Sequence, residues 1–248
     1  MRLIPIIILI ILLSCNTKQG AEKSIAKTEN IETSETENSF LDTTKEDTLK
    51  TEIIETFVDS LNIGEKGKCK IELIKHRVYD DNYVIIKFYI KGPNTWYIQN
   101  TYSYETNALM EFQPNISDFN NDKFNDITFI SGTAARGANE VRRLFIYEVQ
   151  NREIISIVNS QDFPNMMYNK ELDCIDAFLV HGGSSTVFAR LKGDSLIEFA
   201  SVHNDNNRTV YEIDKFGREK LLRKDTIINN ENVYVRYRNY KPLKEYIE

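Results

Sequence analysis

Short runs of β-branched and aromatic residues constrain the fold of this chain more than any other feature. From Lys70 onward, Tyr, Phe, Ile and Val recur in runs of strand length, and Asn, Asp and Gly separate these runs. This composition favours strands over helices. The expected strands are 70–78, 83–91, 95–104, 127–131, 141–149, 153–159, 175–181, 187–192, 195–202, 209–214, 219–226 and 232–240.

The segments between these runs predict hairpins rather than helical crossovers. The clearest turns are Asp80-Asp81-Asn82, Lys91-Gly92-Pro93-Asn94, Lys192-Gly193-Asp194 and Phe216-Gly217. Gly, Asn and Asp adopt turn conformations at little cost. We therefore expect an all-β fold, an antiparallel meander that is either propeller-like or a β-sandwich. No repeat of fixed period is visible, so the sequence sets no number of blades.

The segment before the first expected strand fits two patterns. Its apolar residues fall on one face of a helix, and part of the set also alternates as in a strand. These residues are Ile53, Ile54, Phe57, Val58 and Leu61. We expect a short helix from about Leu49 to Leu61 that packs on the sheet.

Composition separates a polar stretch from one domain. Residues 16–50 are rich in Thr, Glu, Lys, Ser and Asn, and such a stretch buries too little surface to offset its ordering entropy. We expect residues 16–50 to be a disordered tether and residues 51–248 to form one all-β domain.

The net charge is −6, with +1 on residues 1–15, −3 on 16–50 and −4 on 51–248. An acidic domain argues against nucleic acid as a partner.

Two cysteines, Cys69 and Cys174, fall within the expected domain. In an exported protein they could form a disulfide bridge. Two buried free thiols are the alternative, because Cys is among the most buried residue types. The sequence contains no C-x-x-C and no Cys/His cluster, so no zinc site is expected.

The N-terminus has the pattern of an export signal. Arg2 precedes an apolar run, Leu3 to Leu13, that is too short for a membrane span and contains Pro5. The run ends in Leu12-Leu13-Ser14-Cys15, which resembles the lipobox of bacterial lipoproteins. The resemblance implies a signal peptide over residues 1–14, cleavage before Cys15 and lipidation of that cysteine. It implies a protein of the bacterial cell envelope, held on a membrane by its lipid and lying outside the cytoplasm.

The loop from Asp118 to Asp126 has the spacing of a calcium-binding loop. Oxygen-bearing side chains stand at its positions 1, 3, 5 and 9, and Phe124 could offer its carbonyl at position 7. Calcium prefers six to eight oxygen ligands. The predicted ligands are Asp118, Asn120, Asp122, Phe124 and Asp126. Lys123 replaces the usual glycine and Phe129 stands where an EF-hand has Glu, so an Asn/Asp turn without metal is the alternative.

A wider stretch resembles a family of bacterial envelope proteins with a calcium-bound, β-propeller-like domain, which includes periplasmic lysozyme inhibitors. The motifs that carry this resemblance are the Asp118–Asp126 loop, Ser131-Gly132-Thr133, Leu144-Phe145-Ile146-Tyr147, Asp162-Phe163-Pro164-Asn165 and His181-Gly182-Gly183. The resemblance implies one calcium ion on the loop and a lysozyme-like peptidoglycan hydrolase as a protein partner.

An arginine-containing segment is the candidate contact for such a partner. Arg136 lies among small residues between Ser131 and Arg143, and Arg142 and Arg143 close the segment. An arginine on a Gly-flanked loop can pair with a carboxylate through two hydrogen bonds. A solvated hairpin loop is the plainer interpretation of the same residues.

The sequence assembles no catalytic motif, so we expect a binding protein rather than an enzyme. His181-Gly182-Gly183-Ser184 resembles an oxyanion-hole string but has no G-x-S-x-G elbow to serve. Trp96, near Tyr97, Tyr102 and Tyr104, could form a platform for sugars, although a strand with one core face gives the same pattern. The alternative functions are a glycan hydrolase with unrecognised carboxylates and a purely structural lipoprotein.

Overall fold

The computed structural model of this protein describes residues 51–79, 81–106, 110–228 and 232–246. The expected signal peptide, Cys15 and the expected tether over residues 16–50 lie outside the described residues. No helix among the described residues is long and apolar enough to cross a bilayer.

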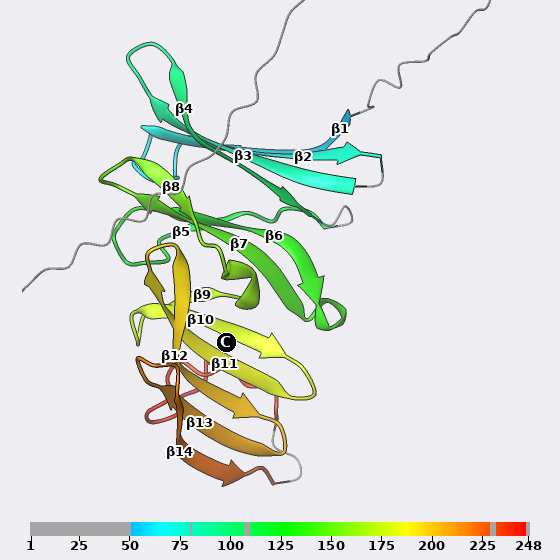
Figure 1. The fold of residues 1–248 in the computed structure, drawn as a ribbon, viewed down its shortest axis with the longest axis vertical. Coiled ribbons are helices and arrows are strands. Elements are labelled where there is room, and N and C mark those ends of the chain that lie inside the picture. Colours follow the sequence, from blue (N-terminus) through cyan, green and yellow to red (C-terminus); the bar gives the residue numbers. More distant parts are fainter. Residues whose placement is uncertain (1–50, 80, 107–109, 229–231, 247–248) are drawn as a thin grey trace, which may run out of the picture. The chain divides into compact units, whose positions relative to one another are not determined.

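The described residues form three antiparallel sheets (Figure 1). The N-terminal sheet has the strand order β1-β2-β3-β4, the middle sheet β5-β6-β7-β8, and the C-terminal sheet β14-β13-β12-β11-β10-β9. Their strands are β1 (Thr51–Asp59), β2 (Cys69–Val78), β3 (Asp81–Lys91), β4 (Trp96–Glu105), β5 (Asn115–Ser117), β6 (Asp126–Ala134), β7 (Asn139–Glu148), β8 (Glu153–Ser156), β9 (Met167–Asn169), β10 (Cys174–Val180), β11 (Ser184–Lys192), β12 (Ser195–Asn204), β13 (Asn207–Ile213) and β14 (Glu219–Thr226). Two 3-10 turns complete the described elements, η1 (Ala135–Gly137) and η2 (Ser160–Asp162).

Each strand pairs with the strand before or after it in the sequence, and no sheet closes into a barrel within the described residues. This confirms the predicted all-β antiparallel meander. The patterns missed β5 and β9, because an element of three residues is too short to show a period.

The helix predicted from Leu49 to Leu61 is wrong. Residues Thr51–Asp59 form β1, which pairs with β2 and carries a register shift between Ile53 and Glu55. Phe57 packs against the core, whereas Ile53 and Val58 are 61% and 52% exposed. The segment is extended because β2 supplies its hydrogen bonds. The register shift places Ile53, which pairs with His76, on the face opposite to Phe57, which pairs with Leu73.

The strand predicted over Asn232–Tyr240 is also wrong. This segment has one isolated bridge, between Tyr237 and Glu245, and no ladder among the described residues. Tyr237 is buried in a cluster with Phe188 and Val202 of the C-terminal sheet. The apolar residues of the segment thus cover a sheet face instead of extending the sheet edge.

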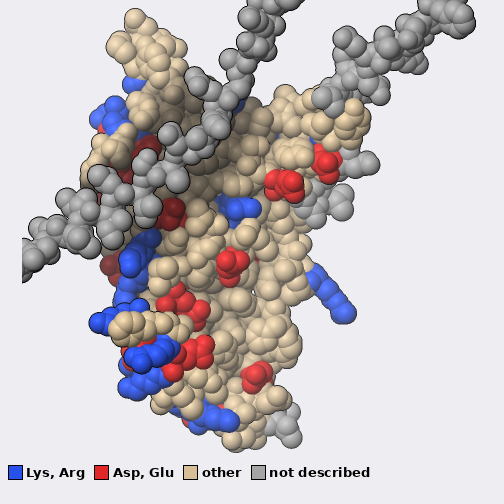
Figure 2. Space-filling view, in the orientation of Figure 1, with Lys and Arg blue, Asp and Glu red and all other residues tan. Residues whose placement is uncertain are grey.

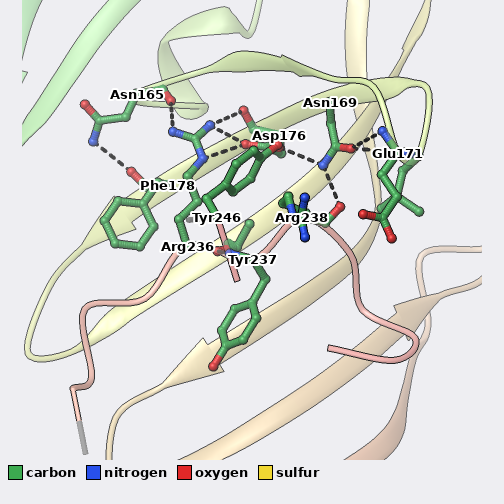
Figure 3. Close-up of polar contacts among 11 residues, drawn as sticks. Asn165, Asn169, Glu171, Asp176, Phe178, Arg236, Tyr237, Arg238 and Tyr246 are labelled. Atoms are coloured by element: carbon green, nitrogen blue, oxygen red, sulfur yellow. Dashed lines mark hydrogen bonds and ion pairs between the residues drawn. The ribbon is translucent and has the colours of Figure 1, made fainter. Parts of the chain in front are cut away.

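A buried carboxylate fixes the C-terminal segment, residues 232–246, on the C-terminal sheet (Figure 3). Asp176 of β10 is fully buried and accepts hydrogen bonds from Arg236 Nε at 2.8 Å, Asn169 Nδ2 at 2.8 Å and the Tyr246 hydroxyl at 2.7 Å. Arg236 also donates to the backbone oxygen of Asn165 at 2.9 Å. A buried ion pair is tolerated only when its polar atoms are satisfied in this way, so this network determines the path of the segment.

The middle sheet supplies side chains to two cores. Phe145 and Tyr147 of β7 pack with the N-terminal sheet, while Leu144 and Ile146 pack with the C-terminal sheet. Successive residues of a strand point to opposite faces. The four consecutive apolar residues of β7 therefore join one sheet to each side of the middle sheet.

Removing either set of contacts should destabilise the protein strongly. We expect Phe145→Ala to lower the free energy of unfolding by about 3–5 kcal/mol and Leu144→Ala by about 2–5 kcal/mol, since each leaves a cavity in a different core. Ile197, 51% exposed on β12, is the control. Ile197→Ala should change the free energy of unfolding by no more than about 0.5 kcal/mol. Denaturant titration measures all three. A loss below about 1 kcal/mol for either core variant would contradict packing on both faces.

Candidate functional site

The loop with the calcium-like spacing joins β5 to β6 and folds around its own polar side chains. Asp118 Oδ2 accepts a hydrogen bond from Lys123 N at 2.8 Å, and Asp122 Oδ1 accepts one from Phe124 N at 2.8 Å. Asn120 Nδ2 donates to Asp122 Oδ2 at 2.9 Å. Lys123 has a φ of 76°, so it adopts the left-handed conformation that usually favours glycine. The loop is therefore closed tightly despite the lysine.

Asp126, the last predicted ligand, is turned into the core. It is fully buried, and its oxygens accept hydrogen bonds from Phe119 N at 2.7 Å and Tyr147 N at 2.9 Å. Burial raises the pKa of Asp126 to about 8, and the charges of Asp122 and Asp118 act in the same direction. Asp126 fastens the loop to β7 through these two backbone groups.

The same loop contacts segments that belong to the other two sheets. Asn125 Nδ2 donates to the carbonyl of Asn62 at 3.0 Å, and Gly64 N donates to the carbonyl of Asn125 at 2.8 Å. Asn121 Nδ2 donates to Asp173 Oδ1 at 3.2 Å, in the turn between β9 and β10. A conformational change in this loop would therefore alter hydrogen bonds to segments of all three sheets.

The chemistry of the loop suits calcium, since its donors are all oxygens. No group of three His, Cys, Asp or Glu side chains in the described part of the chain is gathered so that it could hold a metal ion. The loop would have to draw its carboxylates together to place them at the distance of about 2.3–2.6 Å that calcium needs. Asp118, Asn120 and Asp122 stand nearest to that arrangement, because they already share hydrogen bonds within the loop.

Arg136 lies at the tip of the hairpin between β6 and β7 and is exposed. Ala135, Arg136 and Gly137 have φ values of 49°, 58° and 94°, so three consecutive residues are left-handed. A non-glycine residue in this region costs about 1–2 kcal/mol. Arg136 forms no hydrogen bond or ion pair with the described residues, which leaves its guanidinium group available.

The structure separates Arg142 and Arg143 from Arg136. The guanidinium of Arg142 donates to Glu140 Oε2 at 2.9 and 3.1 Å and to the carbonyl of Gln113 at 3.0 Å. The guanidinium of Arg143 lies over the Tyr104 ring, 4.5 Å from its centroid. Both side chains are thus used within the fold, and Arg136 is the one of the three that is exposed and makes no such contact with the described residues.

Cys69 and Cys174 are buried free thiols. They belong to different core clusters, Cys69 with the N-terminal sheet and Cys174 with the C-terminal segment. The bridge between them is therefore not formed, and the alternative of two buried thiols describes the structure. Burial raises the pKa of both thiols, that of Cys174 to about 12.

Strand pairing creates a histidine–serine chain that the sequence patterns did not reveal. Gly183 N donates to His181 Nδ1 at 3.2 Å, so the proton of a neutral His181 lies on Nε2, 2.9 Å from Ser185 Oγ. The Ser185 hydroxyl can then donate to His203 Nδ1 at 2.7 Å. Ser185 and His203 are opposite one another on β11 and β12, and only the strand register brings them together. Ser185 is 4% exposed, so its hydroxyl is not presented as a nucleophile. The histidine–serine chain instead links the β10–β11 hairpin to β12 through hydrogen bonds.

The aromatic residues near Trp96, which could have formed a platform for sugars, do not share one face of the N-terminal sheet. Tyr102 donates to the carbonyl of Ile154 at 2.8 Å and Tyr104 bonds to Ser156 Oγ at 2.7 Å, so both face the middle sheet. Trp96 pairs with Lys91 across β3 and β4. The four aromatic residues therefore do not form one platform.

Comparison with known proteins places the chain in no family. No family model and no curated protein matches it. A solved structure of a Xanthomonas type IV secretion system related protein is similar, with 9% sequence identity and a TM-score of 0.44, over 68% of this chain and 93% of that one.

Protonation of His203 should destabilise the fold in acid. Burial lowers the pKa of His203, and the neighbouring His181 adds to this effect, while Glu219 and Asp205 oppose it. An unfolded histidine titrates at about 6.5, so below that pH His203 binds more protons in the unfolded state and its contribution to stability is lost. The raised pKa of Asp126 acts in the opposite direction over the same pH range, and it does so in every variant. Between about pH 7.5 and pH 5, the denaturation midpoint of the wild type should therefore fall more, or rise less, than that of His203→Gln. His76→Gln, on β2, is the control and should change as the wild type does. Equal changes in wild type and His203→Gln would contradict this assignment.

Proposed function

We propose that this protein is a lipid-anchored binding protein of the bacterial cell envelope that inhibits a lysozyme-like peptidoglycan hydrolase. The anchor is proposed from Leu12-Leu13-Ser14-Cys15, which lies outside the described residues. Mass spectrometry of the mature N-terminal peptide tests it, and an unmodified Cys15 would contradict it. The envelope location follows from the same signal.

The observation that carries the binding role is the Arg136 hairpin tip. Its exposed guanidinium has no partner among the described residues, and its backbone is left-handed at three consecutive positions. Strained backbone is retained where the surrounding structure requires it, often at a binding site. A lysozyme cleft contains two catalytic carboxylates, and a guanidinium group matches a carboxylate with two parallel hydrogen bonds.

Replacing Arg136 should weaken inhibition. We expect Arg136→Ala to raise the concentration needed for half inhibition at least about tenfold, because truncating a desolvated charged contact costs about 2–5 kcal/mol. The assay follows clearing of a peptidoglycan suspension by several lysozymes, with the mature chain carrying Cys15→Ser. Arg218→Ala is the matched control, since Arg218 is an exposed arginine in the turn between β13 and β14 and should not matter.

Two results would redirect this proposal. If wild-type protein inhibits no lysozyme, the inhibitor role is contradicted and a binding protein with another partner remains. If the protein clears peptidoglycan without any lysozyme present, a glycan hydrolase is favoured instead.

We further propose that the 118–126 loop binds one calcium ion. Asp118, Asn120 and Asp122 would supply side-chain oxygens, Phe124 its carbonyl and Asp126 the remaining carboxylate. The ion would offset the repulsion among the three carboxylates. Because the loop contacts segments of all three sheets, bound calcium would stabilise the whole domain.

Chelation tests the calcium site. Calcium at 100 times its dissociation constant stabilises the folded state by about 2.7 kcal/mol, so adding a chelator should lower the melting temperature of the wild type. Asp118→Ala should melt at the same temperature with and without chelator. Asp194→Ala, in the turn before β12, is the control and should respond as the wild type does. A wild type that is unaffected by chelator would support the metal-free turn.

A further inference from the structure

The outer face of the N-terminal sheet combines aromatic and basic side chains. Residues paired across neighbouring strands lie on the same face. Lys70 of β2 pairs with Tyr89 of β3, which pairs with Ile98 of β4, and Lys91 pairs with Trp96 at the end of the hairpin. The alternate residues, such as Ile71 and Phe88, are buried in the core. We call Lys70, Lys87, Tyr89, Lys91, Trp96 and Ile98 the outer-face patch.

Contacts within the outer-face patch hold its rings and its charges together. Lys70 Nζ lies 3.8 Å from the centroid of the Tyr89 ring and 5.9 Å from that of Trp96. Lys91 Nζ lies 5.8 Å from the Trp96 ring. Ile98 is 56% exposed beside them. An apolar surface is therefore exposed directly beside basic groups.

The outer-face patch has an excess of positive charge in an acidic protein. Glu72 faces the same side, paired with Lys87 across the strands, and forms an ion pair with Lys70 at 2.6 Å. Lys87 and Lys91 form no ion pair among the described residues. Figure 2 shows basic side chains beside the tip of the β3–β4 hairpin. Since residues 51–248 carry a net charge of −4, this local excess favours an anionic partner.

We propose that the outer-face patch docks the domain on an anionic phospholipid surface, an inference that rests on the proposed lipid anchor. Tryptophan and tyrosine are enriched at the level of lipid headgroups. Each basic residue near an anionic leaflet strengthens binding about fivefold. The patch supplies both kinds of side chain on one sheet face.

With the anchor in place, a low affinity of the outer-face patch for lipid is enough to dock the domain. A lipid on Cys15 would keep the domain near the membrane through residues 16–50, so docking becomes an intramolecular event at high effective concentration. The same patch on an untethered domain should bind vesicles weakly and with strong dependence on salt. An anchored domain would instead alternate between a docked and a free position.

A second hairpin provides a matched comparison. Phe216, in the turn between β13 and β14, is 70% exposed, and Lys215 Nζ lies 5.0 Å from its ring. Here Asp214 forms an ion pair with Arg218 at 2.7 Å, and over residues 214–219 two acidic residues balance two basic ones. An exposed ring beside a lysine thus occurs in both hairpins, and the charge excess distinguishes the outer-face patch.

The fluorescence of Trp96, the only tryptophan of the chain, reports docking directly. The mature chain carrying Cys15→Ser is titrated with vesicles of phosphatidylcholine containing phosphatidylglycerol and with vesicles of phosphatidylcholine alone. We expect the emission to shift to shorter wavelength with the anionic vesicles only, and the shift to weaken as salt is added. Lys91→Glu should weaken binding at least about fivefold, and Lys215→Glu should leave it unchanged.

Other outcomes would overturn the proposal. They are an unchanged emission with anionic vesicles, an equal loss of binding in Lys91→Glu and Lys215→Glu, and a shift with a soluble anionic polysaccharide but none with vesicles. The last result would assign the outer-face patch to a glycan. Because the assay uses protein without a lipid on Cys15, its failure is distinct from a failure of the anchor, which the mass of the mature N-terminus tests separately.

Discussion

The packing of the middle sheet on both of its faces is the constraint on which the rest of the structure depends. Leu144 and Ile146 of β7 face the C-terminal sheet, and Phe145 and Tyr147 face the N-terminal sheet. A strand covered on both sides loses the usual alternation of apolar and polar residues. The middle sheet therefore acts as the common core layer, and both outer sheets depend on it for the burial of their inner faces.

Two buried carboxylates hold the chain where strand ladders do not. Asp126 accepts two backbone N–H groups and ties the 118–126 loop to β7. Asp176 accepts hydrogen bonds from Arg236, Asn169 and Tyr246 and ties the C-terminal segment to β10. Burying a polar group is costly unless it is hydrogen-bonded, and both carboxylates meet this condition. They set the position of the proposed calcium loop and of the segment that covers the C-terminal sheet.

Both proposed binding surfaces lie on hairpins. Arg136 stands at the tip between β6 and β7, and Trp96 begins β4 just after the turn from β3. Hairpin tips carry few of the contacts that stabilise a core, so their side chains remain free for recognition. Arg142 and Arg143, only a few residues from Arg136, are instead used by Glu140, Gln113 and Tyr104. A difference of a few positions along one hairpin thus separates a structural arginine from an available one.

The sequence by itself determined the all-β class, the antiparallel meander and most strand positions, because the strand period and the turn residues are local properties. It did not determine how Ile53 to Leu61 would fold, since a helical face and an alternating strand fit the same apolar residues until β2 is present as a partner. It could not predict the covering role of residues 232–246, because that depends on Asp176 sixty residues earlier in the chain.

The candidate sites divide in the same way. The spacing of Asp118, Asn120 and Asp122 is visible in the sequence, and the loop does fold around these side chains. Only the tertiary structure turned Asp126 toward the core, kept Cys69 and Cys174 in separate clusters, and brought Ser185 between His181 and His203. Local spacing records which groups can meet within one loop, whereas strand register and sheet packing decide which distant groups do meet.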